Sequence, residues 1–245
     1  SMGKSNLYLY SLEEARRRGE LPLWQASQRT NIACRDALSG AVKACDDSGV
    51  SGTDCMAKII HKFGGQRTAW VLANTLQHLN WWPGLFSPAN QAWARQFYIP
   101  LDGYNGDYVV PGSPAVLDCF VTQYRKFCQS LGLFELEHCI PNSRHQLDYT
   151  GRVLVLSPAV LDEPCWSPQG QLWYAHDGPG CNPDSIVGSI RATRLADGEQ
   201  ACWNRTNFAG ALQDELLPDW ARKPLLALRS QGRQDKPSMC SMRMG

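Results

Sequence analysis

The spacing of the apolar residues changes once along this 245-residue chain, and that change constrains the fold more than any other feature. Up to about residue 140 the apolar residues recur every three or four positions, for example in the stretch 55–63, which is the period of a helix with one buried face. After a polar stretch at 141–151, Val153-Leu154-Val155-Leu156 forms a continuous apolar run of strand length. The sequence therefore predicts an α+β protein, with a helical domain over 1–140 and a small α+β domain over 151–228.

Capping residues mark the helices of the first predicted domain. Ser11 is placed to cap a helix, Glu14 is placed to reach back to it in a capping box, and Gly19 ends that helix. Ser87-Pro88 and Ser113-Pro114 each combine a capping serine with a proline at the first helical position. We expect helices over 11–18, 22–45, 53–63, 66–79, 88–97 and 114–131, the second of them interrupted by a polar run at 27–31.

The second predicted domain contains a hairpin. Residues 189–195 and 200–203 flank Asp197-Gly198, a dipeptide typical of hairpin turns, so we expect two antiparallel strands there. Helical patterns resume at about 206–217 and 219–228, divided by Pro218. Beyond Leu228 the apolar pattern stops and basic residues dominate, which predicts a disordered basic tail over 229–245.

Composition bounds the class of protein and its surroundings. Hydrophobic residues make up 43% and charged residues 19% of the chain, and no apolar stretch reaches the ~18–20 residues that a membrane span needs. The start of the sequence lacks the pattern of a secretory signal, so we expect a soluble cytoplasmic protein with no membrane partner. The ten cysteines are scattered and are read as reduced thiols. A net charge of +1 argues against an acidic mimic of nucleic acid.

The densest cluster of reactive side chains lies at 176–181. His176, Asp177 and Cys181 surround a Gly-Pro-Gly turn, and a nearby imidazole is what lowers the pKa of a nucleophilic cysteine. Adjacency in sequence rarely assembles a catalytic site, so an enzyme with Cys181 as its nucleophile is the alternative reading, and no catalytic residue is assigned. The thiols and the imidazole at 119, 128, 138 and 139 lack the paired spacing of a zinc site. No metal or cofactor is predicted.

Two groups of residues are candidates for binding. Trp81 and Trp82 occupy a break between helices, where at most one ring can easily face the core, and exposed tryptophans are favoured anchors for a protein partner. Asn74, Gln77 and His78 fall on one face of the preceding helix and could line a small-molecule pocket. The basic tail leaves open a third possibility, a nucleic-acid-binding module.

Several sequence blocks resemble an uncharacterised domain family, a domain of unknown function found in gut Firmicutes and often on conjugative and other mobile elements. The resemblance covers roughly residues 5–130. It rests on Tyr8-Leu9-Tyr10-Ser11, on the segments 18–24 and 31–35, and on the later blocks 71–78, 84–94 and 107–110. A block between Val153 and Trp220 resembles a region of the same proteins. The resemblance brings no activity and no site residue.

The expected function combines this setting with the lack of a standard catalytic motif. We expect a non-enzymatic accessory protein of a mobile element that binds another macromolecule. An anti-defence role, such as inhibition of a CRISPR effector or of another host nuclease, fits an element that must survive in its host. The cysteine enzyme and the nucleic-acid-binding module remain the alternatives.

Overall fold

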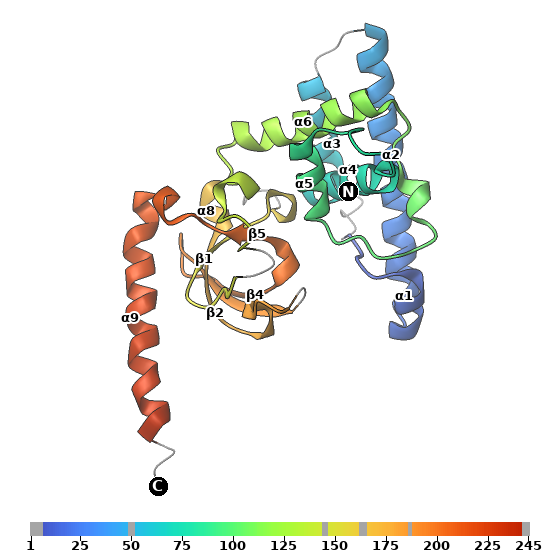
Figure 1. The fold of residues 1–245 in the computed structure, drawn as a ribbon. Coiled ribbons are helices and arrows are strands. Elements are labelled where there is room, and N and C mark those ends of the chain that lie inside the picture. The colour runs from blue at the N-terminus through green and yellow to red at the C-terminus, as the bar shows by residue number, and fades with distance from the viewer. Residues whose placement is uncertain (1–6, 49–51, 144–146, 162–165, 186–187, 242–245) are drawn as a thin grey trace. The chain divides into compact units, whose positions relative to one another are not determined.

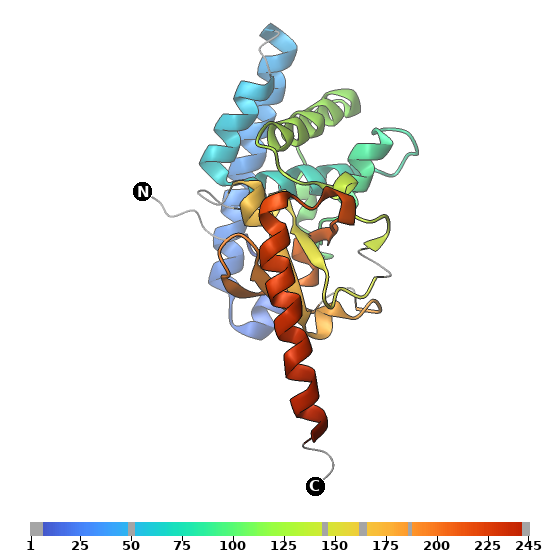
Figure 2. The same cartoon turned by 90° about the vertical axis from the view of Figure 1, so that its left-hand side faces the viewer.

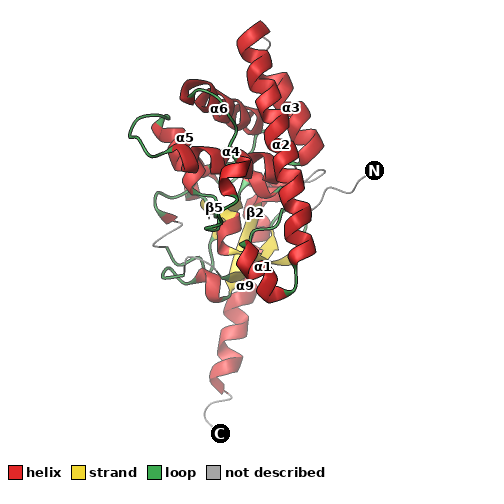
Figure 3. Cartoon of the chain, turned by 90° about the vertical axis from the view of Figure 1, so that its right-hand side faces the viewer, coloured by secondary structure: helices red, strands yellow, loops and turns green. Residues whose placement is uncertain are grey.

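A computed structural model describes residues 7–48, 52–143, 147–161, 166–185 and 188–241. The chain divides into two compact units, residues 1–131 and 132–245, and each unit is described by itself below. The fold class is α+β, with helices first and one antiparallel sheet after them, as the sequence predicted. Figure 3 separates helices from strands by colour. Within the described residues, no helix is both long and apolar enough to cross a membrane.

The first unit is helical, and α4 forms its centre. Every residue of α4 from Arg67 to Leu76 is buried. The long helix α2 and the shorter α3 run side by side (Figures 1 and 2), and both also contact α4. The helices are α1 (Leu12–Arg18), α2 (Leu21–Ser48), α3 (Gly52–Phe63), α4 (Gly65–Leu79), α5 (Pro88–Arg95) and α6 (Pro114–Ser130), with a short 3₁₀ turn, η1, at Asn105–Tyr108.

The predicted caps are present, with one difference. The side chains of Ser11, Ser87 and Ser113 each accept a hydrogen bond from a backbone N–H in the first turn of their helix. Gly19 ends α1 with φ at 70°, in the left-handed region that favours glycine. Glu14 does not complete the expected capping box, because its carboxylate binds Arg17 and Arg18 on the next turn of the helix.

The second unit is built on a five-stranded antiparallel sheet in the order β4-β3-β2-β1-β5. The strands are β1 (Val153–Leu156), β2 (Leu172–Asp177), β3 (Ser189–Arg194), β4 (Gln200–Asn204) and β5 (Phe208–Ala211). The predicted hairpin is β3–β4, in which Ile190 pairs with Trp203 and Gly198 adopts a φ of 78° in the turn. The helix predicted at 206–217 is wrong, because the buried run from Phe208 to Ala211 pairs with β1 as a strand.

Helix α9 (Asp219–Ser241) covers one face of this sheet. Its Ala221 and Leu225 pack into a core with Val153, Val155 and Leu172. Figure 1 shows the remainder of α9 running past the sheet. The prediction of a disordered tail from residue 229 is corrected by this helix. The apolar pattern ends where α9 stops packing against the sheet. Beyond that point Arg, Gln and Lys, which favour helices, continue the helix.

The division between the units also falls earlier than expected. It lies between Leu131 and Gly132, whereas the sequence placed it near residue 140. The segment after Gly132 belongs to the sheet unit because Cys139 lies in the core under α9 and forms a bridge with Leu212. The described parts of the polar stretch, 141–143 and 147–151, lie inside the second unit.

Candidate functional site

The loop at 176–181 is closely packed against β3. A Cβ on Gly178 would stand 2.3 Å from the carbonyl oxygen of Ser189, and a Cβ on Gly180 would stand 2.3 Å from that of Gly188. Both distances are shorter than any real contact, so only glycine fits at these two positions. The Gly-Pro-Gly segment is thus explained by a backbone contact inside the sheet unit.

The reactive side chains of this loop point to different partners. His176 Nε2 lies 2.6 Å from Thr193 Oγ1, and Asp177 forms an ion pair with Arg191 at 2.8 Å. Cys181 is buried, and burial raises the pKa of its thiol, which is the opposite of what a nucleophile needs. Across the described residues no hydrogen bond joins Cys181 to His176, so these contacts favour a structural role for the cluster.

The cysteines and the histidine considered for metal binding are dispersed. Cys119 and Cys128 belong to α6 in the first unit, whereas His138 and Cys139 lie in the second. His138 Nδ1 accepts a hydrogen bond from the Glu135 N–H at 2.8 Å. Within the described ranges, no three His, Cys, Asp or Glu side chains are placed to hold a metal ion. The eight cysteines whose side chains the structure describes form no disulfide with one another.

Two of the three polar residues on α4 connect that helix to a neighbouring loop. Asn74 is buried and donates to the carbonyl of Asn105 at 2.9 Å. Gln77 donates to the carbonyls of Ala94 and Phe97 at 2.8 and 3.2 Å. His78 is exposed, and its ring lies 3.6 Å from the place that a Cβ on Gly106 would take. These residues therefore hold the segment 94–106 on α4.

The Trp81-Trp82 turn follows directly at the end of α4. Trp81 is 75% exposed and Trp82 is 62% exposed, so the structure turns both rings outward where the sequence allowed one to be buried. Their centroids lie 6.4 Å apart, and the ring planes meet at 75° in an edge-to-face pair. Two large aromatic side chains are thus presented together on the surface of the helical unit.

A second feature of the helical unit was not predicted: a small aromatic pocket. It is partly open to solvent and leaves about 10 Å³ for the centre of a water-sized group. Residues 24, 27, 28 and 31 of α2 form one wall, at the spacing of a single helix face. The aromatic lining residues are Tyr8, Tyr10, Trp24, Trp70 and Tyr108, and the polar ones are Ser27, Gln28, Asn31, Asp102 and Asn105.

Asp102 holds the rim of this aromatic pocket together. Its Oδ2 accepts from the Leu12 N–H at 2.9 Å and from Trp24 Nε1 at 3.3 Å, and its Oδ1 accepts from the Tyr104 N–H at 3.2 Å. The carboxylate thus lies at the N-terminus of α1, where the helix dipole favours a negative charge. It joins α1, α2 and the loop before η1.

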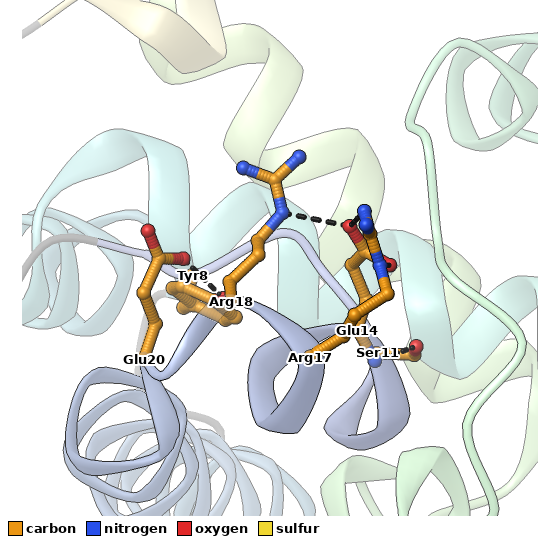
Figure 4. Close-up of polar contacts among 6 residues, drawn as sticks. All are labelled: Tyr8, Ser11, Glu14, Arg17, Arg18 and Glu20. Atoms are coloured by element: carbon orange, nitrogen blue, oxygen red, sulfur yellow. Dashed lines mark hydrogen bonds and ion pairs between the residues drawn. The ribbon is translucent and has the colours of Figure 1, made fainter.

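Tyr8 closes the pocket from the segment that precedes α1. Its backbone N–H donates to Ser27 Oγ at 3.0 Å, and its hydroxyl donates to Glu20 Oε2 at 2.6 Å (Figure 4). Burial and the bond to Glu20 raise the pKa of Tyr8 to about 12. The neighbouring Tyr10 lies under the guanidinium of Arg18, whose Cζ is 3.8 Å from the ring centroid. Tyr10 therefore already makes a cation–π contact.

A buried arginine lies behind the polar wall. Arg67 donates to the carbonyl of Ser27 at 3.1 Å and to Asn31 Oδ1, and burial lowers the pKa of its guanidinium to about 10. Burial, and after it the charges of Asp102 and Asp107, raise the pKa of the Tyr108 phenol at the other side of the pocket. The lining itself therefore carries a carboxylate, and the arginine, which is not a lining residue, donates to oxygen atoms of Ser27 and Asn31.

The comparisons with known proteins give a family and no activity. Residues 7–129, half of the chain, match a family described as a protein of unknown function, DUF3849, and the chain belongs to that family. Neither a curated protein nor a solved structure shows significant similarity to it. The matched region contains the Trp81-Trp82 turn and every residue of the aromatic pocket.

Proposed function

We propose that this protein is a non-enzymatic accessory protein that acts in the cytoplasm by binding another protein through Trp81 and Trp82. The observation that carries the proposal is the exposure of both rings at one turn of the family domain. A tryptophan buries a large apolar area on binding while immobilising few torsions, and such residues supply much of the free energy at protein interfaces.

The electrostatic balance of the chain favours a contact of this kind over a phosphate contact. Net charge is +1, and the nearest Lys or Arg residues to the tryptophan pair in the sequence are Arg67, which is buried, and Arg95. Association driven by an apolar anchor depends weakly on salt, whereas binding to a phosphate backbone weakens steeply as salt is added.

The test needs the partner and two substitutions. A pull-down from a lysate of a relevant bacterium, read by mass spectrometry, provides the partner, and the dissociation constant is then measured with purified proteins. Trp81→Ala and Trp82→Ala should each weaken binding by roughly 2 kcal/mol, about 30-fold. Leu101→Ala is the matched control, because Leu101 is 99% exposed but stands outside the aromatic pair.

Salt distinguishes this interface from the nucleic-acid alternative. If the affinity falls steeply with added salt and survives both tryptophan changes, the protein contact at this turn is refuted. The basic residues of α9, which include Arg222, Lys223 and Arg229, then become the binding element.

The proposal also includes the class of protein to which the partner belongs. The resemblance to proteins of mobile elements supports a host defence nuclease, a CRISPR effector among them, as the target. Purified protein should then reduce cleavage of target DNA by such a nuclease, and Trp81→Ala should restore cleavage. Full cleavage at a protein concentration that saturates binding would refute the anti-defence role.

The enzyme alternative rests on Cys181 and receives less support. Its thiol is buried with a raised pKa, and His176 is engaged by Thr193. Rapid, selective alkylation of Cys181 at neutral pH would favour the enzyme over the binding protein.

A further inference from the structure

We infer that the aromatic pocket of the helical unit is a binding site for a primary ammonium group, R–NH₃⁺. The inference goes beyond the proposed contact at Trp81 and Trp82 and does not depend on it. Three properties of the pocket carry it, namely its walls, its acceptors and its size.

The walls are aromatic. Trp24, Trp70 and Tyr108 are buried around the pocket, Trp70 and Tyr108 meet edge to face at 5.7 Å, and the more exposed Tyr10 stands at the opening. Aromatic faces attract cations and also cover an alkyl stem. The guanidinium of Arg18 over the Tyr10 ring is a direct instance of such attraction at this rim.

The acceptors suit an ammonium group, which has three N–H donors and no acceptor. Asp102 is the carboxylate of the lining, and its three contacts with N–H groups leave room at a group that has about four acceptor positions. The Tyr108 hydroxyl, which also lines the pocket, is already hydrogen-bonded by the side chains of Asn31 and Gln28, so Asp102 is the acceptor on which the inference rests. The negative charge near this wall is also felt by Tyr108, whose pKa the field of Asp102 helps to raise.

The size selects among cations. Room for the centre of about one water-sized group fits an –NH₃⁺ tip, which is about as large as water, better than a bulkier trimethylammonium group. The stem of the ligand then leaves through the open side, past Tyr10. Such a tip is present both in small alkylamines and in the lysine side chain of a protein.

The charges at the pocket also disfavour an anionic ligand. The buried Arg67 would attract one, but Arg67 is not a lining residue, and its guanidinium already donates to Ser27 and Asn31. An anion in the pocket would meet the carboxylate of Asp102 directly. We therefore assign the site to cations and use an anion as the opposing probe.

The experiment is a titration followed by NMR of the tryptophan indole N–H groups in the full-length protein. n-Butylammonium should shift the signals of Trp24 and Trp70, assigned by Trp→Phe variants, and should leave those of Trp81 and Trp82 unchanged. n-Butanol, which has the same butyl stem, is the neutral control, and butyrate, whose alkyl stem is one carbon shorter, is the anionic control. Equal shifts with n-butanol, larger shifts with butyrate, or no shift with the amine would each overturn the inference.

Two substitutions test which residues of the pocket contribute to amine binding. Asp102→Asn, which removes the charge, and Tyr10→Leu, which removes the aromatic rim, should each weaken amine binding at least about tenfold. Trp81→Ala should leave it unchanged. Because Asp102 also holds α1, the thermal transition of each variant is recorded. If Asp102→Asn fails to fold, Tyr10→Leu alone decides, and unaltered amine binding in that folded variant overturns the inference.

A last comparison separates the two sources of the ammonium group. N-acetyl-lysine methylamide is titrated beside n-butylammonium. A lysine derivative that binds at least about tenfold tighter indicates the side chain of a protein, whereas equal affinities indicate a free amine. Either result supports the ammonium site.

Discussion

The helical unit and the sheet unit differ in where they place their chemically distinctive residues. In the helical unit, Trp81 and Trp82 are exposed and the aromatic pocket opens to solvent. In the sheet unit, Cys181 and Arg205 are buried, and the Gly-Pro-Gly loop is closed against β3. Reactive residue types that are dense in the sequence, as at 176–181, can therefore serve packing alone. Aromatic residues that are spread along the sequence instead form the accessible candidate sites.

Arg205 offers the strongest test of the closed sheet unit. Its guanidinium is fully buried, donates to the carbonyls of residues 143, 147, 180 and 182, and lies 3.8 Å from the ring centroid of Tyr149. Arg205→Met would leave these buried carbonyls without that donor, at about 1–3 kcal/mol for each unsatisfied group. We expect the free energy of unfolding, measured in urea, to fall by roughly 3 kcal/mol or more.

The matched control is Arg191→Met in the same unit. Arg191 forms an exposed ion pair with Asp177, and such pairs contribute about 0–1 kcal/mol. Equal losses in the two variants would mean that the buried arginine does not organise the loop.

Two glycine substitutions should change stability in opposite directions. Gly180→Ala introduces a Cβ 2.3 Å from the carbonyl oxygen of Gly188 and should destabilise the sheet unit by about 2 kcal/mol. Gly40 lies in the middle of α2, and no atom outside its own helix turn lies within 4 Å of the place that an alanine methyl would take. Gly40→Ala should therefore stabilise the helical unit by ~0.5–1 kcal/mol. Chemical denaturation measures both changes. A harmless Gly180→Ala would show that the loop is looser than described.

Thiol reactivity distinguishes a buried cysteine from an exposed one on neighbouring segments. Cys202 on β4 is exposed, whereas Cys181 is buried and the pKa of its thiol is raised. Iodoacetamide at neutral pH should modify Cys181 at least about tenfold more slowly than Cys202, as peptide mapping by mass spectrometry would show. Faster modification of Cys181 would make the 176–181 loop a catalytic candidate again.

The smallest expected effect is a pH dependence that originates at His176. Burial, and after it the charge of Arg191, lowers the pKa of this imidazole, so the folded protein holds the neutral form more strongly than the unfolded chain does. The resulting stabilisation is complete above the unfolded pKa of about 6.5 and is lost as the pH falls through the lower folded value. His176→Asn should reduce the slope of stability against pH between about 7 and 5. An unchanged slope would contradict this assignment.

The sequence was informative wherever local chemistry decides the structure. The serine caps at 11, 87 and 113 and the β3–β4 turn depend on a few adjacent residues, and all of them are present. The helix predicted at 206–217 failed because the short run 208–211 becomes a strand only through its pairing with β1. Such a long-range contact leaves no local signal.

The candidate sites show the same limit. The turn at Trp81 and Trp82 was identified from its position between two helices. The aromatic pocket was missed, although Trp24, Ser27, Gln28 and Asn31 already have the spacing of one helix face. Their polar side chains looked like an interruption of the core, because the opposite wall comes from α4 and from Asp102 and Tyr108, far along the chain.

The strand order of the sheet has a consequence for biosynthesis. Strand β1 lies between β2 and β5, and its four residues are all buried. Its second neighbour, β5, is the last strand to be translated. On the ribosome, β1 to β4 can pair as a meander as soon as they have emerged. One edge of β1 stays unpaired until β5, which begins at Phe208, has also emerged. Unpaired apolar edges of this kind promote aggregation. Expression of the sheet unit should therefore be sensitive to translation speed over residues 157–211, and a chain cut before Phe208 should be insoluble.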